Sequence, residues 1–399
     1  MDEADVDDVI TTVRRLVRER VVPLEQQIDE TDEVPAMLIE AAAEMGLYGF
    51  AIPEEYGGLG LSMTQEARLV MELGYTTPAF RSLFGTNNGI AGHVLLEGGT
   101  PEQRKEYLPR LATGEWTAAF ALTEAEAGSD PAGLRTSARR ADGGYVLSGS
   151  KRYITNAPIA DVFMVFARHG ERDQASRDIS VFLVPRGAPG LTVGPRDAKM
   201  GQHGAWTAEV VLDDVRVPET SLVGGPAGHG TGYLTAMRCL AHGRLHIAAL
   251  CTGMAQRLLE ETVSYALERK QSGRPIAEFQ LVQGLIADSQ TDVYASRALV
   301  LSAAGEFDAG TDTRMGPSCA KYFASEAVGR VADRAVQVFG GAGYMRGVVV
   351  ERFYRDARLF RIYEGTSQVQ QVVIAKQALA RAGNQIVGSP TPKYTEHGT

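Results

Sequence analysis

Hydrophobic residues recur with a helical period at both ends of the chain and in short runs in its middle. Near the start, six apolar residues mark one buried helix face, at Val6, Val9, Ile10, Val13, Leu16 and Val17. Thr100 is the predicted N-cap of a later helix, with Gln103 completing a capping box and Gly114 ending the helix. Residues 1–116 are therefore predicted to form an N-terminal helical domain.

The middle of the chain holds short apolar, β-branched runs at residues 162–166, 179–184 and 210–212. Clusters of Gly, Pro, Asp and Asn separate these runs, and no long helical pattern lies between them. The pattern predicts a small, mainly antiparallel central β domain over residues 117–228.

Long helical periods return toward the C-terminus. One helix face, which stops at Gly340, carries Val328, Val331, Ala332, Ala335, Val336 and Phe339. A similar stripe runs over 281–301, so residues 229–385 are predicted to form a C-terminal helical bundle. The polar remainder, residues 386–399, is predicted to be a flexible tail. The fold class is therefore α+β and multidomain.

Composition narrows the class of protein further. Of the 399 residues, 44% are hydrophobic and 22% are charged, which is typical of globular proteins, and the net charge of -9 argues against a nucleic-acid surface. The three cysteines lack CxxC spacing. The acidic start of the chain does not fit a targeting peptide, and no apolar run approaches the ~20 residues of a membrane span. We expect a cytoplasmic protein with no nucleic-acid or membrane partner.

The most informative candidate for chemistry is Glu364, which lies between Tyr363 and Gly365 just before a predicted helix. Thr366 is the predicted N-cap of that helix. A glutamate in such a turn can project into a cavity that nearby N–H groups also face, so Glu364 suits a general base. The alternative is that Glu364 only complements the helix dipole.

Two segments of the β domain could contact a ligand. The Ala-Gly-Ser-Asp turn at residues 127–130 offers backbone amides and a hydroxyl to a phosphate or a ring edge, although it could simply be a connecting turn. Tyr153 and Thr155 would present an aromatic ring and a hydroxyl on one side of a strand. A core tyrosine is the alternative interpretation of Tyr153.

The remaining motifs are weaker. The glycines after Gln337 follow a helix rather than a strand, so they form no dinucleotide fingerprint, but they would let a backbone or a pyrophosphate approach. Residues 269–274 could be a solvated helix end or a phosphate contact through their arginines. Four histidines show no metal-ligand spacing with a carboxylate partner, so no metal site is predicted at His203, His229, His242 and His246.

The order and spacing of these motifs, over about residues 5 to 382, resemble the acyl-CoA dehydrogenase family. Six stretches carry the resemblance, at residues 122–130, 153–156, 213–218, 268–280, 337–341 and 363–366. The resemblance implies an N-terminal helical domain, a central β domain and a C-terminal four-helix bundle, with FAD between the last two. It also implies a homotetramer, built as a dimer of dimers, with FAD at the subunit interface.

By position, the resemblance also implies the binding residues. FAD contacts within the subunit would come from Phe120, Leu122, Thr123, Gly128, Ser129, Tyr153, Ile154, Thr155, Thr366 and Gln368. Contacts with the FAD bound mainly to a neighbour would come from Arg269, Phe279, Gln280, Gln337, Gly340 and Gly341. Substrate contacts would come from Ser129, Arg244, Tyr363 and Gly365.

The resemblance implies an activity as well. Glu364 would take the α-proton of an acyl-CoA thioester while hydride passes from the β-carbon to the flavin N5, which gives a trans-2-enoyl-CoA. The backbone N–H of Glu364 and a ribityl hydroxyl of FAD would hold the enolate-like oxygen, at ~3 kcal/mol each. Electron-transfer flavoprotein is the expected electron acceptor, and fatty-acid metabolism is the expected setting.

The chain departs from the family pattern at four places. Ala125 and Glu126 replace a usual proline and glycine, and Tyr153 replaces a more usual tryptophan. Ala241 stands where some members have an aspartate, and Trp206 stands where small residues are more common. The last two departures leave the acyl specificity open.

Two other functions remain as alternatives. The first is a flavin-dependent acyl-CoA oxidase or monooxygenase of the same fold, although the complete Glu364 motif disfavours a monooxygenase, which needs no such base. Gly243 occupies the position where some members place their base, so Glu364 has no rival there. The second is a non-enzymatic, flavin-free helical scaffold.

Overall fold

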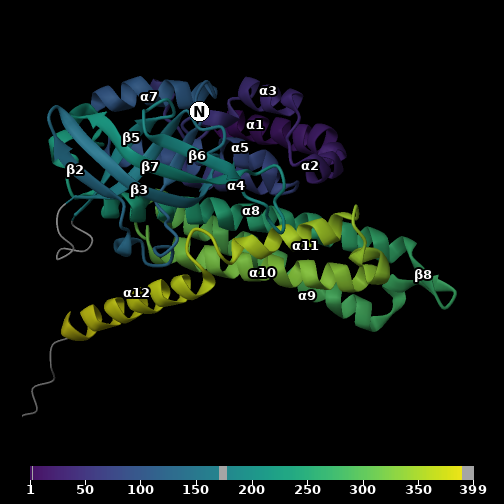
Figure 1. Cartoon of the computed structure of the whole chain (residues 1–399). Coiled ribbons are helices and arrows are strands. Elements are labelled where there is room, and N and C mark those ends of the chain that lie inside the picture. Colours follow the sequence, from purple (N-terminus) through teal and green to yellow (C-terminus); the bar gives the residue numbers. More distant parts are fainter. Residues whose placement is uncertain (2, 170–177, 389–399) are drawn as a thin grey trace, which may run out of the picture.

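The computed structural model describes residues 1, 3–169 and 178–388. Figure 1 shows the helices from both ends of the chain packed along one another, with the sheet from the middle of the chain beside them. The predicted α+β class, with a β domain between two helical parts, is confirmed. In these described ranges, no helix is long and apolar enough to cross a membrane.

The helices of the N-terminal part follow the predicted patterns. They are α1 (Glu3–Leu16), α2 (Glu25–Thr31), α3 (Ala36–Glu44), α4 (Met63–Leu73), α5 (Pro78–Gly89), α6 (Ala91–Gly98) and α7 (Pro101–Thr113). Val6, Ile10 and Val13 are buried on α1, as predicted. The capping box of Thr100 and Gln103 begins α7, and the helix ends at Gly114, whose φ of 78° suits a glycine.

The central part forms one twisted sheet. Its strands are β1 (Ala118–Ala121), β2 (Ser137–Ala141), β3 (Gly144–Thr155), β4 (Val162–Arg168), β5 (Ile179–Pro185), β6 (Leu191–Arg196) and β7 (Thr207–Pro218). The strand order is β1-β4-β2-β3-β7-β6, with β5 paired to β4. The pairs of β1 and β2 with β4 are parallel and the other pairs are antiparallel, so the mainly antiparallel prediction is confirmed.

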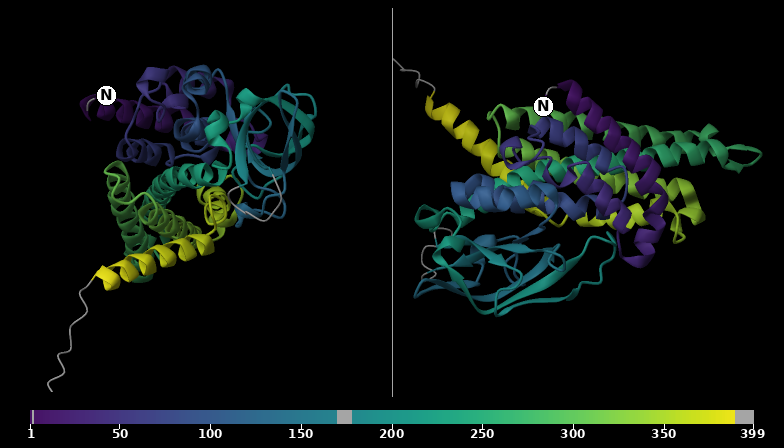
Figure 2. Two further views of the ribbon diagram at one scale, coloured as in Figure 1. Left: turned by 90° about the vertical axis from the view of Figure 1, so that its left-hand side faces the viewer. Right: turned by 90° about the horizontal axis from the view of Figure 1, so that it is seen from above.

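The C-terminal part consists of long helices, one of which projects from the rest. They are α8 (Gly232–Glu268), α9 (Gln280–Asp308), α10 (Met315–Phe339), α11 (Val349–Phe360) and α12 (Ser367–Gly388). Figure 2 shows the sheet along one side of the helices and α12 pointing away from them. A small hairpin of β8 (Lys270–Gln271) and β9 (Arg274–Pro275) joins α8 to α9. The predicted tail from residue 386 begins inside α12, and residues 389–399 lie outside the described part.

The N-terminal and C-terminal helices share one hydrophobic core. A single cluster of buried side chains extends from Val6 in α1 to Phe360 in α11. Where α4 meets α8, a Cβ atom on Gly253 would lie 2.0 Å from the carbonyl oxygen of Met71, so no side chain fits there. The two backbones therefore touch, and the helices from the two ends of the chain are held in one arrangement.

A buried ion pair also joins the two ends of the chain. Arg352 of α11 donates from Nη2 to Glu25 Oε2 of α2 at 2.7 Å, and Thr76 Oγ1 donates to Glu25 Oε1 at 2.6 Å. Both charged side chains are buried. Burial raises the pKa of Glu25, and the charge of Arg352 opposes that effect. The pair therefore stabilises the fold only as long as both partners are present.

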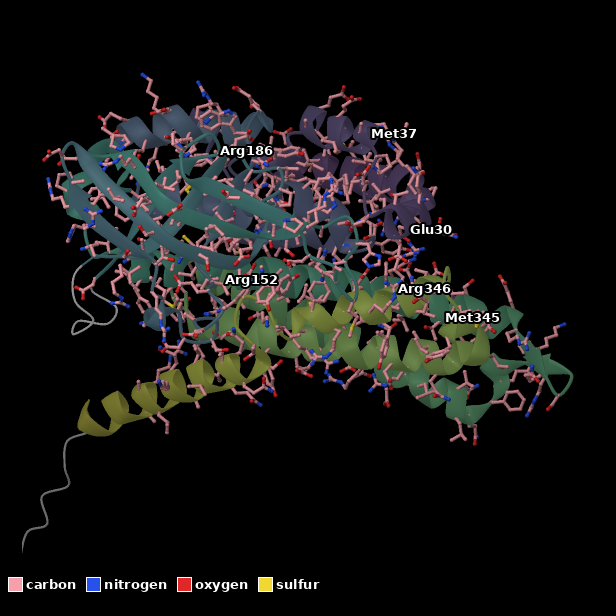
Figure 3. All side chains as sticks on the ribbon, in the orientation of Figure 1. Glu30, Met37, Arg152, Arg186, Met345 and Arg346 are labelled. Atoms are coloured by element: carbon pink, nitrogen blue, oxygen red, sulfur yellow. The ribbon has the colours of Figure 1, made fainter. Side chains whose placement is uncertain are left out.

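Glu25→Gln should lower the free energy of unfolding by about 3 kcal/mol, because Arg352 would keep its charge in the core after losing its ion-pair partner. Urea unfolding followed by circular dichroism measures this loss. Glu30→Gln is the matched control, since Glu30 is an exposed carboxylate of the same helix (Figure 3), and it should change stability by less than about 0.5 kcal/mol. Equal losses in the two variants would contradict the assignment.

Candidate active site

Glu364 lies in the short loop between α11 and α12. Glu364 and Gly365 have left-handed φ angles of 52° and 90°, a conformation that costs a non-glycine residue about 1 kcal/mol or more. Gln370 Nε2 donates to the carbonyl oxygens of both residues, at 3.1 and 3.2 Å, and Lys321 Nζ donates to that of Gly365 at 2.7 Å. Thr366 accepts the predicted N-cap hydrogen bond of α12. Side chains of α10 and α12 thus hold the loop in its strained form.

The Glu364 carboxylate points into the protein. The residue as a whole is half-buried, but its Oε2 atom is removed from solvent and has no hydrogen-bond partner among the described residues. A Cβ atom on Gly243 of α8 would lie 2.4 Å from that oxygen, so the carboxylate packs where α8 has no side chain. Burial raises the pKa of Glu364, and the charges of Arg81, Lys321 and Arg244 oppose it.

Three cations from three helices surround this carboxylate. Arg244 of α8 is buried, with Nε 3.5 Å from the carbonyl oxygen of Glu364. Lys321 of α10 is fully buried, and burial lowers its pKa to about 8. Arg81 of α5 is buried and bonds to His246 instead of to the loop. The site therefore combines an unpaired carboxylate with nearby positive charge.

A buried ion pair shapes the turn that was predicted to touch the flavin. Lys151 Nζ of β3 donates to Glu124 Oε1 at 2.7 Å, and the backbone N–H groups of Arg135 and Thr136 also donate to the Glu124 carboxylate. The backbone N–H of Arg152 donates to the carbonyl of Thr123 at 2.9 Å. This anchoring leaves Gly128 and Ser129 exposed at the tip of the turn.

The end of β3 is irregular, and this decides where its side chains point. The β3–β7 register shifts between Lys151 and Ile154, and Tyr153 has a left-handed φ of 57°. The Tyr153 side chain is 63% exposed, so the alternative of a core tyrosine is wrong. Thr155 is half-buried, whereas Ile154 belongs to the core, so only its backbone could meet a ligand. Leu122 is buried as well, and Phe120 is half-buried.

The residues predicted to reach a neighbour's FAD lie at the far tip of the C-terminal helices. Arg269 directly follows α8, Phe279 directly precedes α9, and Gly340 directly follows α10. Gln280, Gln337 and Gly341 are exposed close to these positions in the chain. Figure 1 shows this tip at the β8 hairpin, and Figure 3 shows Met345 there, away from Arg152 beside the sheet. One chain therefore does not bring the two predicted sets together.

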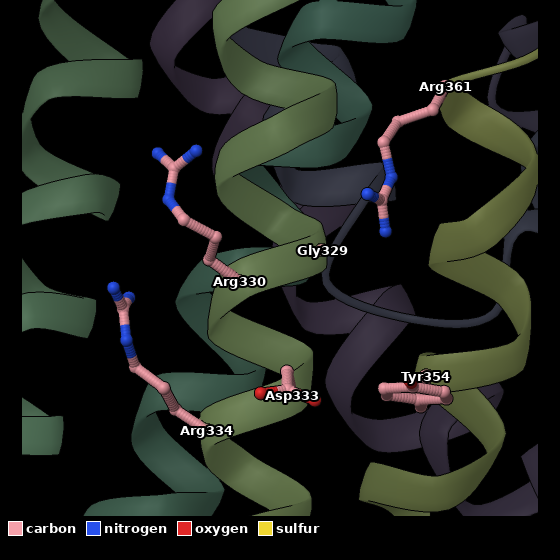
Figure 4. Close-up of a pocket in the computed structure, with 6 residues that line it drawn as sticks. All are labelled: Gly329, Arg330, Asp333, Arg334, Tyr354 and Arg361. Carbon is pink, nitrogen blue, oxygen red and sulfur yellow. The ribbon is translucent and has the colours of Figure 1, made fainter.

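The pocket in Figure 4 is a separate feature of about 400 Å³. It is lined by Gly329, Arg330, Asp333, Arg334, Tyr354 and Arg361, none of which was predicted as a site residue. Arg330 and Arg334 pair with Asp292, and Arg361 pairs with Glu326. Because its arginines are already paired, this pocket is not the candidate site.

Two histidines form a buried cluster with a carboxylate that sequence reasoning did not find. His246 Nε2 and His242 Nε2 of α8 lie 2.5 and 3.1 Å from Glu66 Oε2 of α4. His203 likewise lies 3.0 Å from Asp29. Spacing along the sequence therefore did not reveal the carboxylates that these three histidines meet in the fold. Glu66, His242 and His246 each offer one ligand atom, and the three atoms lie within 4.8 Å of one another, close enough to hold a metal ion. The predicted absence of a metal stays a prediction.

Sequence reasoning also missed the side chains that surround Glu364 and hold its loop. Lys321 and Gln370 hold the loop, Arg81 supplies a nearby charge, and Lys151 anchors the turn. One signal was available, because Lys321 occupies the same face of α10 as the buried residues Ala324 and Val328. A charged side chain on a buried face needs a partner, although the sequence does not tell which one.

Comparisons with known proteins agree with this arrangement. Models of three acyl-CoA dehydrogenase domains match the chain, the N-terminal domain over residues 3–115, the middle domain over 119–215 and the C-terminal domain over 230–379. An acyl-CoA dehydrogenase of Bacillus subtilis (strain 168) is 39% identical over 367 residues, which cover 92% of this chain and 96% of the relative.

Two further proteins extend the comparison. A 3-(aryl)acrylate reductase of Clostridium sporogenes (strain ATCC 15579) is 37% identical over 371 residues, with 92% of this chain and 97% of the relative covered. The solved structure of butyryl-CoA dehydrogenase from Megasphaera elsdenii matches with a TM-score of 0.90 at 32% identity, over 95% of this chain and 99% of that one. The chain therefore belongs to the acyl-CoA dehydrogenase family.

Proposed function

We propose that the protein oxidises an acyl-CoA thioester to the trans-2-enoyl-CoA, with Glu364 as the base that removes the α-proton. Family membership makes the protein an FAD-dependent oxidoreductase. The observation that carries the finer proposal is the Oε2 atom of Glu364, which is buried without a partner on a strained but well-held loop. A carboxylate in that state is free to accept a proton from a ligand.

The residues around the turn of the β domain fit a flavin. Tyr153 offers an exposed ring one residue after Arg152, whose backbone N–H bonds to Thr123. Among the described residues, a methyl group of Thr123, at 4.0 Å, is all that a Cβ atom on Gly128 would meet. That space lets a ring edge or a phosphate approach the backbone. FAD, when bound, supplies the acceptor for the hydride that leaves the β-carbon. Thr366 and Gln368 lie at the start of α12 and would hold the cofactor from the other side.

The loop itself offers what the reaction needs at the thioester. Among the described residues, no hydrogen-bond acceptor is found for the backbone N–H of Glu364, so this group is available to the thioester oxygen. One such donor in a dry site stabilises the transition state and lowers the activation barrier by ~3 kcal/mol. Arg244, Tyr363 and Gly365 adjoin the base and are proposed to bind the substrate, with Ser129 reaching it from the exposed turn.

We further propose a homotetramer in which a neighbour completes each cofactor site. The residues predicted to reach a neighbour's FAD are exposed, except for the half-buried Phe279, and the β8 hairpin near them lies far from the sheet of the same chain (Figure 1). Large apolar side chains are exposed on the C-terminal helices, such as Leu281, Tyr294 and Leu379. An open apolar groove of about 420 Å³ is lined by Leu299, Cys319, Tyr322, Phe323, Gln371, Ile374 and Ala375. Such surfaces are typical of subunit interfaces.

A reductase is the second candidate, because one relative of high coverage is a 3-(aryl)acrylate reductase. The same base can return a proton to the α-carbon when an enoyl thioester is reduced, so Glu364 serves either direction. Anaerobic mixing with saturated and with unsaturated acyl-CoA thioesters separates the two: bleaching by the saturated ligand favours the dehydrogenase. Rapid recovery of the colour in air would favour an oxidase over transfer to an electron-transfer flavoprotein.

Glu364→Gln should keep the bound FAD and the affinity for acyl-CoA but lose at least about 10³-fold in kcat, because glutamine cannot accept the α-proton. A dye-linked assay over a panel of acyl-CoA thioesters measures the loss. Glu106→Gln, which changes an exposed carboxylate of α7, is the control and should keep its activity. Turnover of Glu364→Gln within tenfold of the unchanged protein would sink the proposal.

The pH profile tests the state of the same group. Because burial raises the pKa of Glu364, the acid limb of kcat/KM should lie above the ordinary glutamate value of about 4.3, with the rate falling as the pH drops through that limb. Steady-state rates from pH 4 to 9 measure it, with thermal denaturation at each pH as the control for unfolding. A limb at or below the ordinary value contradicts the burial argument.

Dilution tests the shared cofactor site. If tip residues of a neighbour hold part of FAD, dissociation of the oligomer should release flavin in step with the loss of mass. Analytical ultracentrifugation at flavin and protein wavelengths follows both quantities. Arg269→Ala should make flavin dissociate at a higher protein concentration than in the unchanged protein. Arg346→Ala is the control, because Arg346 is an exposed arginine near the same tip. Monomers that keep their full flavin complement would contradict the proposal.

A further inference from the structure

Arg81 of α5 is an unusual buried cation. Its Nη2 atom lies 3.0 Å from His246 Nδ1, and its Nε atom is buried with no hydrogen-bond partner among the described residues. No ion pair joins Arg81 to a carboxylate in the described ranges, although arginine is rarely buried without one. The charge therefore needs an explanation beyond packing.

The hydrogen bonds fix the protons of the groups beside Arg81. Because an arginine only donates, His246 Nδ1 accepts, and its Nε2 donates to Glu66 Oε2 at 2.5 Å. His242 Nδ1 donates to the carbonyl of Gly89 at 3.1 Å, which leaves its Nε2 as an acceptor that faces Glu66. A proton must then lie between Glu66 and His242.

Burial decides which of the two groups holds that proton. It raises the pKa of Glu66 and lowers the pKa of His242 to about 4, so the proton belongs to Glu66. The His246–Glu66–His242 chain is then neutral. A divalent metal ion bound to the same three groups would add two positive charges beside Arg81, and Glu66 is the one carboxylate among them to balance these charges. A neutral network of protons and hydrogen bonds therefore explains the cluster better than a metal site does.

With Glu66 neutral, Glu364 is the carboxylate that remains to balance Arg81. Among the acidic groups near Arg81, Glu364 exerts the largest electrostatic effect on it. Arg81 and Glu364 both lie near the chain at Gly89 and Ile90. A Cβ atom on Gly89 would be 3.2 Å from Arg81 Nη2. A Cβ atom on Gly243 would meet both Ile90 and Glu364 Oε2. The arginine and the base thus flank the end of α5.

We propose that Arg81 is a positioning residue for the base: the neutral His246–Glu66–His242 chain fixes its guanidinium so that its charge keeps the Glu364 carboxylate ionised before substrate binds. This inference rests on the proposed role of Glu364. A base that is buried before the reaction must still be deprotonated, and a fixed cation that makes no hydrogen bond to it achieves this without blocking the oxygen.

The other charged groups near this arrangement have different tasks. Arg244 and Lys321 direct their hydrogen bonds to the carbonyl oxygens of Glu364 and Gly365, so they hold the loop. The Asp308 carboxylate of α9 accepts from the backbone N–H groups of Met63 and Thr64, and its charge acts on Glu66 and His242. His93 of α6 stacks on His242 at 3.8 Å between ring centroids. Burial lowers the pKa of His93, which keeps that ring neutral.

The test compares Arg81→Met and Arg81→Gln with Arg81→Lys in the full chain loaded with FAD. The two neutral variants should move the acid limb of kcat/KM up by about 1–3 pH units, because an opposite charge lowers a carboxyl pKa by that amount. Arg81→Gln keeps a donor for His246 in case Arg81→Met does not fold. Arg81→Lys keeps the positive charge and should leave the acid limb close to its position in the unchanged protein. Arg352→Met, which removes another buried arginine, should lower stability without moving the limb.

A second readout does not depend on turnover. Infrared difference spectra during pH titration report the C=O stretch of the protonated Glu364, identified by its absence in Glu364→Gln. In the neutral Arg81 variants this band should appear at higher pH than in the unchanged protein. If acyl-CoA oxidation is absent altogether, the proposed function fails, but the infrared titration still decides the role of Arg81.

Two results would overturn the inference. Slower turnover in both neutral variants with an unmoved acid limb and an unmoved infrared titration would mean that Arg81 only supports the fold. One equivalent of a metal ion in the purified protein, by elemental analysis, with loss of that metal in His246→Asn, would replace the proton network by a metal site.

Discussion

Burying the Glu364 carboxylate costs desolvation energy, and the structure offsets that cost with cations instead of direct hydrogen bonds to Oε2. A hydrogen bond or close ion pair to that oxygen would stabilise the ionised form at the price of its basicity. Charges held at a distance by other partners avoid that conflict. Arg81, Arg244 and Lys321 are each anchored elsewhere, so the Glu364 Oε2 atom stays unpaired among the described residues while the surrounding charge stays balanced.

This balance depends on the core that the two ends of the chain share. Arg81 comes from an N-terminal helix, whereas Arg244, Lys321 and Glu364 come from the C-terminal part. A shift of α4 and α5 against α8 by a fraction of an ångström would alter every distance in the charge balance. The backbone contact at Gly253 leaves no room for such a shift, since interiors are packed as tightly as crystals. Core packing is thus part of the electrostatics of the site.

Local features were predictable from the sequence, and long-range pairings were not. The stripe of α1, the capping box at Thr100 and the stop at Gly340 depend on residues within one or two helical turns, and all agree with the structure. The outward turn of Tyr153 depends on how β3 pairs with β7, which no short pattern encodes. Likewise, Glu66 lies 176 residues from His242, so spacing rules for metal or proton sites could not join them.

The predicted cofactor residues lie in two distant regions of the chain. The turn at residues 123–129 and the loop of Glu364 would hold the part of a ligand where chemistry occurs, whereas the exposed tip beyond α8 and α10 has no ligand to hold within its own chain. A glycine-rich segment with open space at Gly340 and Gly341 gains nothing for stability, because glycine raises the entropy of the unfolded chain. The proposed homotetramer explains such a segment, because a second chain would bring its own ligand to it and the exposed tip would then complete the site around that neighbour's Glu364.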